Sequence, residues 1–468
     1  MTKYLSIAVA LIALVSALIA APEPVSDSAS ASASHAAVQL PPFACEADDG
    51  ALSWTDHSES KYWVYRSVDG VTYSWLGRTA GSPASTTFTD SNPPADSTYQ
   101  VHYAGIPRVT CTDANDNPGG SAPTVAVVCE DDSGDAGRIN SAIGTSPDGA
   151  EILITGVCSI GETIRLLGNR SYRGESRSGT ILHQAAGSSL DAILASDSYL
   201  DNASFTGLPV AVRHLKLRGS GGGDTAGLIV RSWLTTIEDV WVENMGGDGI
   251  RLTNRGNGGA ALNNTQVNGR ISGVFVTGSG NHGIHVHDDQ NQVTDWTLTD
   301  SWIAESENDG IHIDNAAGWM VERNHVYNVG HHAIWADRLF GSTISNNYVE
   351  GFGESGDAAP GNGWYGIFGS VQGSDVASTV HANRVFNFGG EPDNAATYNY
   401  IGLDLNYGEG SVSVTGNAVV GVDSSGSIGL KYRANSGTSL DVASTGNSVR
   451  KIATPIDVGP AVTVTNGY

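Results

Sequence analysis

The sequence predicts an all-β protein: a coiled solenoid of short strands, preceded by a small antiparallel β-sandwich. Glycine is abundant, with 59 residues among 468, and aromatic residues make up only 7%. This composition is typical of short strands joined by tight turns. Short apolar runs alternate with turn residues over 43–112. From residue 124 onward, two residue patterns recur in step with each other to the C-terminus.

The first forty residues resemble an export signal and a linker. Lys3 precedes an apolar run that ends at Ala20 and Ala21, small residues of the kind found at a cleavage site. We therefore predict a signal peptide over residues 1–21, with a single membrane anchor as the alternative. Residues 22–42 are rich in Ser, Ala and Pro and are expected to form a linker. The prediction is a secreted, extracellular protein that has no membrane contact after signal cleavage.

The chain is strongly acidic, with 49 Asp and Glu against 24 Lys and Arg and a net charge of −25. Because nucleic-acid binding depends on cationic surfaces, nucleic acid is excluded as a partner. A densely anionic polysaccharide would also be repelled unless a cation lay between the two. The chain is expected to be a monomer.

Four cysteines, an even number in an oxidising compartment, indicate two disulfides. Of the three possible pairings we favour Cys45–Cys111 and Cys129–Cys158, because each pair falls within one of the two predicted domains. A zinc site built from cysteines is disfavoured, since no Cys-x-x-Cys spacing occurs.

Residues 43–112 carry the pattern of a small sandwich. Short strands are expected at 51–54, 62–65, 74–77, 86–89 and 99–103, separated by Asp, Gly, Ser and Pro turns. The runs LSWTDHSESKYWVYRSVDG and STYQVHYAG resemble bacterial fibronectin type III-like modules. That resemblance implies a spacer or adhesion role and no chemistry.

Residues 124–468 contain an internal repeat. Apolar residues at helical spacing over 137–143 predict a short helix that caps the first strand. A Gly-Ile pattern then recurs, as in Gly249-Ile250 and Gly283-Ile284. In step with it, a polar residue stands two positions before an aliphatic one, first at a spacing of 23 residues. These positions, expected to form a ladder of stacked amides, are Ser301, Asn324, Asn347, Asn383, Asn417 and Asn447.

This repeat resembles the right-handed parallel β-helix of the pectate-lyase-like superfamily across residues 124–468. The resemblance implies the fold but no single reaction, because lyases, hydrolases, esterases, epimerases and adhesins share it. The polygalacturonase branch carries an Asp-Asp pair, a Gly-His-Gly and an Arg-x-Lys. Here His287-Asp288-Asp289 is similar to the first, no Gly-His-Gly follows, and Lys431-Tyr432-Arg433 reverses the third.

One wall of the predicted solenoid concentrates functional side chains. In the Gly-Ile strands, inward aliphatic residues alternate with outward polar ones, so successive coils about 4.8 Å apart stack the outward residues into two columns. The first column is predicted to hold Arg251, His285, His312, Trp335, Phe368, Asp404 and Lys431. The second is predicted to hold Thr253, His287, Asp314, Asp337, Ser370, Asn406 and Arg433.

The preferred interpretation is a glycoside hydrolase that acts on an extracellular polysaccharide. Such enzymes need two carboxylates, of which one is held protonated. We predict Asp314 and Asp337 as the catalytic pair, with mutual repulsion raising one pKa, and Asp404 as a third carboxylate. The acid/base or subsite residues would be His285, His287 and His312. Sugar-binding residues would be Trp335, Phe368, Trp364, Asp289, Asn406, Lys431 and Arg433, with loops 354–364 and 390–398 as groove walls.

Two alternatives stay open. A polysaccharide lyase would use a Lys, Arg or His as base, and the aspartates could hold Ca²⁺ to neutralise a uronate carboxyl. No cofactor is required by the hydrolase interpretation. A non-catalytic glycan-binding adhesin would need the aromatic residues but not the paired aspartates.

Overall fold

The computed structural model describes residues 45–48, 51–54, 61–67, 74–80, 86–89, 98–103, 106–113, 123–355, 363–387, 397–421 and 426–465. The predicted signal peptide and linker lie outside these residues. The chain divides into two compact units, residues 1–119 and 120–468. No helix in the described part has both the length and the apolar character needed to cross a membrane.

The first unit contains seven described strands in two antiparallel sets. One set has the order β1-β2-β5 and the other β4-β3-β6-β7, and a short parallel contact between β1 and β7 joins them. Leu52, Val64 and Val101 are buried. The strands are β1 (Cys45–Asp48), β2 (Ala51–Trp54), β3 (Lys61–Ser67), β4 (Ser74–Ala80), β5 (Thr86–Thr89), β6 (Thr98–Tyr103) and β7 (Ile106–Asp113).

Five strands of this unit, β2 to β6, fall where the sequence pattern predicted them, whereas β1 and β7 were not predicted. The fibronectin type III-like character of the unit stays a prediction. Glu46 pairs with Thr112 in the β1–β7 contact, one residue after Cys45 and Cys111. The bond between these two cysteines also stays a prediction, because their side chains lie outside the described part.

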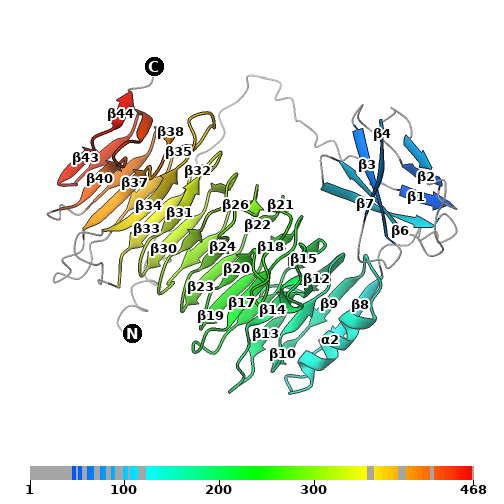
Figure 1. The fold of residues 1–468 in the computed structure, drawn as a ribbon. Coiled ribbons are helices and arrows are strands. Elements are labelled where there is room, and N and C mark those ends of the chain that lie inside the picture. Colours follow the sequence, from blue (N-terminus) through cyan, green and yellow to red (C-terminus); the bar gives the residue numbers. More distant parts are fainter. Residues whose placement is uncertain are drawn as a thin grey trace, which may run out of the picture. The chain divides into compact units, whose positions relative to one another are not determined.

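The second unit is a parallel β-helix. Each complete coil gives one strand to each of three parallel sheets, and the coils follow one another in chain order (Figure 1). The first sheet comprises β10 (Val157–Ile160), β13 (Ile181–Gln184), β16 (Lys216–Arg218), β19 (Trp241–Met245), β23 (Phe275–Ser279), β27 (Trp302–Ala304), β30 (His325–Val329), β33 (Tyr348–Phe352), β36 (Arg384–Phe386), β39 (Ala418–Val420) and β42 (Ser448–Arg450).

The second sheet carries the predicted wall. It comprises β11 (Ile164–Leu166), β14 (Ala192–Ser196), β17 (Ala226–Val230), β20 (Ile250–Thr253), β24 (Ile284–His287), β28 (Ile311–Ile313), β31 (Ile334–Leu339), β34 (Trp364–Val371), β37 (Tyr398–Asp404), β40 (Ile428–Tyr432) and β43 (Thr454–Val458).

The third sheet begins beside the N-terminal cap. It comprises β8 (Thr124–Val128), β9 (Glu151–Thr155), β12 (Arg170–Gly174), β15 (Val210–Arg213), β18 (Thr236–Glu238), β22 (Arg270–Ser272), β26 (Thr297–Thr299), β29 (Met320–Glu322), β32 (Thr343–Ser345), β35 (Thr379–His381), β38 (Glu409–Thr415), β41 (Ser439–Thr445) and β44 (Val462–Thr465). A small additional pair is formed by β21 (Gln266–Val267) and β25 (Val293–Thr294).

The core fills the inside of the coils. Alternation along each short strand sends every second residue inward, and the parallel register stacks equivalent residues. The inward row of the second sheet has no solvent exposure, and it consists of Ile250, Ile284, Ile311, Ile334, Ile367 and Ile401.

The predicted asparagine ladder is confirmed. The Asn347 side chain accepts hydrogen bonds from the backbone N–H of Asn324 at 3.0 Å and from its Nδ2 at 3.1 Å. It donates to the Val321 carbonyl at 2.9 Å and to Oδ1 of Asn383 at 3.1 Å. The same pattern continues through Asn417 and Asn447. Each coil along this ladder is therefore joined to the next by hydrogen bonds between asparagine side chains.

The N-terminal cap also matches the prediction. Helix α2 (Asp135–Thr145) buries Ile139 and Ile143 against the first coil, and Cys129 is bonded to Cys158. A cap of this kind protects the edge of a stacked sheet from pairing with another chain. The second described helix, α3 (Asp197–Leu200), is a single turn after β14.

Candidate functional site

The register of the second sheet builds the predicted wall, with one correction. Arg251, His285, His312, Trp335 and Phe368 occupy consecutive positions of the first column, as expected. The next position belongs to Gly402 and not to Asp404, which instead stands beside Ser370 in the second column, where Asn406 was expected. The Gly402-Leu403 pair imitates the Gly-Ile pattern, but Ile401 is the residue that continues the inward row. A shift of two residues keeps the same face and so leaves no trace in the alternation.

A further row of polar residues lies at the coil corner before these strands. Asp248, His282, Asp309 and His332 each stand directly before the small residue that opens the strand, a glycine in three cases and an alanine in the fourth. Glycine is required at such a corner: a Cβ on Gly283 would lie 2.4 Å from the Ile303 side chain. The four polar residues of this corner row were not among the predicted site residues.

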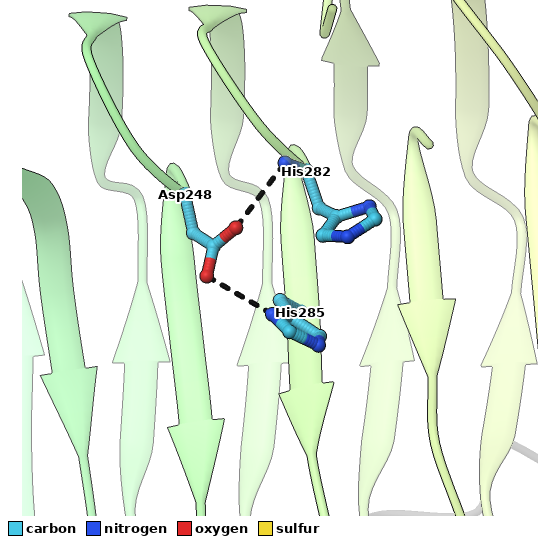
Figure 2. Close-up of side chains that lie close together, drawn as sticks. All are labelled: Asp248, His282 and His285. Carbon is cyan, nitrogen blue, oxygen red and sulfur yellow. Dashed lines mark hydrogen bonds and ion pairs between the residues drawn. The ribbon is translucent and has the colours of Figure 1, made fainter. Parts of the chain in front are cut away.

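Asp248 holds His285 in place. The Asp248 side chain has no solvent exposure, and its Oδ2 lies 3.0 Å from Nδ1 of His285 on the next coil. Its Oδ1 accepts the backbone N–H of His282 at 3.2 Å (Figure 2). Two further donors complete the set, Nε of Arg251 at 2.5 Å and Nδ2 of Asn281 at 2.7 Å. Although burial opposes it, hydrogen bonding to His285 keeps the pKa of Asp248 well below its usual range, so this carboxylate is ionised.

Asp309 repeats this arrangement one coil later. Its Oδ2 lies 2.5 Å from Nδ1 of His312, and its Oδ1 accepts the backbone N–H of His332 at 2.8 Å. Burial opposes charge on His312, but hydrogen bonds to Asp309, Asp314 and Asp337 raise the pKa of this imidazole to about 11. The pKa of His285 is raised in the same way by Asp248 and Asp314, against the effect of burial. The rings of His285 and His312 therefore act as imidazolium hydrogen-bond donors.

His282 and His332 have the opposite character. Nδ1 of His282 accepts the backbone N–H of Asp309 at 3.2 Å, and Nδ1 of His332 accepts that of Tyr365 at 3.0 Å. An acceptor nitrogen carries no proton, so both rings are neutral. Burial lowers the pKa of each to about 4. The 3.5 Å approach of His282 to Asp309 is therefore not an ion pair.

The predicted aspartate pair lies in front of the two imidazolium rings. Nε2 of His312 is 2.9 Å from Oδ1 of Asp314 and 3.8 Å from Oδ2 of Asp337. Nε2 of His285 is 3.7 Å from Oδ2 of Asp314. Despite burial, these hydrogen bonds hold the pKa of Asp314 well below its usual range. Asp314 is therefore unsuited to be the protonated member of the predicted pair. Asp337 is the more open of the two, with 48% of its side chain exposed.

The third predicted histidine is peripheral. The ring of His287 stacks on that of His285 at 5.4 Å between centroids. Burial and the charge of His285 lower its pKa. Asp289, a predicted sugar ligand, is engaged with Arg255 and accepts Nδ2 of Asn254 at 2.7 Å.

The aromatic end of the wall differs in part from the prediction. Trp335 stacks on Phe368 at 4.0 Å and donates Nε1–H to Oδ1 of Asp337 at 2.7 Å. Phe368 is only 6% exposed because Trp335 and Tyr365 pack against it, so it offers no free face to a sugar. Trp364 is 9% exposed and stacks on His331 at 4.3 Å, so it does not line an open surface either. Of the predicted groove walls 354–364 and 390–398, residues 356–362 and 390–396 lie outside the described residues.

Asp404 is a half-buried carboxyl close to this aromatic end. Its Oδ2 accepts Nδ2 of Asn406 at 3.3 Å, while its buried Oδ1 has no hydrogen-bond partner. Burial raises the pKa of Asp404, and the negative charge of Asp337 adds to the effect. Nearby, Nζ of Lys431 donates to the Tyr365 hydroxyl at 3.1 Å. Arg433 is engaged with Asp457 on the next coil.

A separate cavity of about 460 Å³ lies between α2 and β11, lined by Asn140, Glu162 and Arg165 among others. It is remote in sequence from the His/Asp cluster, and its lining holds no comparable set of histidines and aspartates. The His/Asp cluster consists of Asp248, His282, His285, Asp309, His312, Asp314 and Asp337. The wall of the second sheet is therefore the candidate site.

Comparisons with known proteins support the fold. The family model described as a right-handed β-helix region matches residues 227–435, in agreement with the predicted handedness. No curated protein matches the chain. Three similar solved structures are the Dettilon tailspike protein, the A-module of the Azotobacter vinelandii mannuronan C-5 epimerase AlgE4, and the catalytic domain of Agl-KA.

These structural similarities are distant. The tailspike is 10% identical, with a TM-score of 0.46 over 72% of this chain and 68% of its own. The epimerase module is 13% identical, with a TM-score of 0.44 over 74% of this chain and 98% of its own. Agl-KA is 12% identical, with a TM-score of 0.44 over 90% of each chain. Similarity at this level gives no information on the reaction.

Proposed function

We propose that the second-sheet wall is the active site of a secreted glycoside hydrolase that cleaves an extracellular polysaccharide. The observation that carries the proposal is Asp404, a carboxyl whose pKa is raised by burial and whose Oδ1 has no partner. A carboxyl with a raised pKa keeps its proton to higher pH than an ordinary aspartate and is suited to deliver it to a leaving group.

Asp337 is the matching base. It follows Ala336, the partner of Gly369, at a register shift in the β31–β34 pairing, and Ser370 on β34 pairs with Asp404, so the two aspartates lie two coils apart on the same wall. Two strand spacings of about 4.8 Å place the backbone positions about 10 Å apart. This is close to the roughly 6.5–9.5 Å separation of carboxyl groups that leaves room for an attacking water in inverting enzymes.

In the proposed reaction, one proton moves from water to Asp337 and one from Asp404 to the leaving group. Asp337 accepts a proton from a water molecule as the water oxygen bonds to the anomeric carbon. The bond between that carbon and the leaving oxygen breaks, and the leaving oxygen takes the proton of Asp404. Trp335, whose indole N–H bonds to Asp337, supplies the aromatic face next to the base. The positive charge of Lys431 suits a sugar that carries a carboxylate.

A lyase is the second candidate, and one observation favours it. Lys431 bonds to Tyr365, and burial lowers the pKa of this lysine, which brings it closer to the neutral form that a base requires. Burial, however, raises the pKa of Tyr365 and disfavours the phenolate. The hydrolase is preferred because burial raises the pKa of its acid, Asp404, in the direction that an acid needs.

The test is a panel of neutral and acidic polysaccharides incubated with the mature protein, with and without chelator. New reducing ends without the ultraviolet absorbance of an unsaturated uronate support hydrolysis. Absorbance that accompanies cleavage supports the lyase. Neither signal on any glycan, together with retained glycan binding, would overturn both and leave the adhesin interpretation.

A further inference from the structure

The His/Asp cluster contains three groups of side chains whose ligand atoms lie close enough to hold a metal ion. The first is Asp248, His282 and His285 (Figure 2). It is already saturated, because the two oxygens of Asp248 accept four hydrogen bonds, one of them from Arg251. The Asp248 carboxylate therefore has no free position to offer an ion.

The second group, His282, Asp309 and His312, is closed in the same way. Nδ1 of His282 is occupied by the backbone N–H of Asp309, and Asp309 accepts both Nδ1–H of His312 and the backbone N–H of His332. The third group, His312, Asp314 and Asp337, differs because the nitrogen it offers is Nε2, on the outer side of the ring.

The two imidazolium rings have the same construction. His285 and His312 each direct Nδ1 to a carboxylate that is almost fully buried, Asp248 and Asp309 respectively. Each directs Nε2 to the same carboxylate, that of Asp314. Metal-binding histidines are commonly oriented in this way, with the nitrogen that does not bind the ion donating its proton to a carboxylate behind the ring.

We propose that Nε2 of His312 and the carboxylates of Asp314 and Asp337 form a binding site for a divalent transition-metal ion, with His285 as a neighbour that contacts Asp314. In a tetrahedral site with bonds of about 2.1 Å, ligand atoms are about 3.4 Å apart. The corresponding distances here are 2.9 Å from Nε2 of His312 to Oδ1 of Asp314 and 3.8 Å from the same nitrogen to Oδ2 of Asp337. These two distances bracket the separation that an ion requires, and the ion would replace the Nε2 proton of His312.

The donor set identifies the class of ion. Imidazole nitrogen and carboxylate oxygen suit Zn²⁺, Mn²⁺, Fe²⁺ and Co²⁺. Ca²⁺ prefers six to eight oxygen ligands, so the calcium that a lyase would need finds a poor match in this group. Attraction for a cation is strong, since Asp248 and Asp309 add their charges behind the ligands.

The experiment uses the full mature chain, stripped with a chelator and titrated with Zn²⁺ against a chromophoric competitor. We expect one Zn²⁺ per chain, and Co²⁺ substitution should give visible d–d absorption. His312→Ala should weaken Zn²⁺ binding at least 100-fold. Asp309→Asn, which touches no ion, should weaken it about 10–100-fold as a positioning residue. His325→Ala is the matched control, a histidine of the first sheet that also contacts a carboxylate, Glu350 at 3.1 Å.

Unaltered Zn²⁺ affinity in His312→Ala, or an equal loss in His325→Ala, would overturn the proposal. So would the absence of saturable binding to the wild type, which would leave a purely protonated ion network. If His312→Ala does not fold, Asp314→Asn decides by the same criterion, because this side chain is partly exposed. The inference shares Asp337 with the proposed function, but its readout involves no glycan. Zn²⁺ binding without glycan cleavage, or the converse, would therefore refute one proposal and keep the other.

Discussion

Replacing Asn347 by alanine tests the account of how the coils are held together. The change removes four side-chain hydrogen bonds and leaves the buried backbone N–H of Asn324 without its 3.0 Å acceptor. An orphaned buried donor costs about 1–3 kcal/mol. The groups in the other three bonds keep other partners: Nδ2 of Asn324, for example, also donates to the Leu298 carbonyl. Loss of these three bonds adds about 1 kcal/mol to the cost. We expect a loss of about 2–4 kcal/mol in the free energy of unfolding.

The matched control is Asn447→Ala at the C-terminal end of the same ladder. Asn447 also makes four side-chain hydrogen bonds, but it is only partly buried, so water can replace the missing amide. Its replacement should cost less than half as much. The assay is equilibrium unfolding in denaturant followed by tryptophan fluorescence, which reports on the buried Trp296 and Trp319. Equal costs for the two variants, or a cost below about 1 kcal/mol for Asn347→Ala, would refute the reasoning.

Three further predictions concern the site and the cap. Asp404→Asn should lower the rate of glycan cleavage by about 10²–10⁴-fold without changing the unfolding midpoint, and wild-type activity should fall as the pH rises through the raised pKa of Asp404. His332 has a pKa of about 4 when folded and 6.5 as a model value, so the unfolded chain takes up its proton first. Wild type should thus lose up to about 3 kcal/mol of stability relative to His332→Gln between pH 6.5 and 4, whereas a flat difference in denaturation experiments would contradict the neutral ring. Replacing Cys129 and Cys158 with serine should destabilise the second unit by about 3–4 kcal/mol, since the bond closes a loop with a sequence separation of 29 residues; an unaltered thermal midpoint would contradict this.

The fold could be predicted from the sequence because the structural repeat appears as a repeat of residue types. A recurring polar residue, spaced by 23 positions at Ser301, Asn324 and Asn347 and by longer steps after them, marks the shortest coil and the position of the ladder. Strict alternation sends Ile284 inward and His285 outward, so the histidines could be assigned to the wall without coordinates. Both the ladder and the orientation of the histidines depend on local periodicity. Alternation every two residues decides which side chains face inward, and the coil length decides which residues stack.

The corner residues show where this reasoning stops. Asp248, His282, Asp309 and His332 precede the strands and belong to no alternating pattern. A signal was present, because Asp-Gly-Ile occurs at 248–250 and 309–311, and His-Gly-Ile at 282–284. Its meaning depends on stacking, which brings an aspartate of one coil to the ring of another residue 37 positions away, as with Asp248 and His285.

The sequence by itself determined the solenoid, the face that carries the histidines and aspartates, and the disulfide of the cap. Only the tertiary structure decided which carboxyl can be an acid. Asp314 lies between two imidazolium rings and is ionised, whereas Asp404 is half-buried with one unpartnered oxygen and retains its proton more readily. Charge state follows from burial and from neighbours on other coils, and neither is encoded in the local pattern around an aspartate.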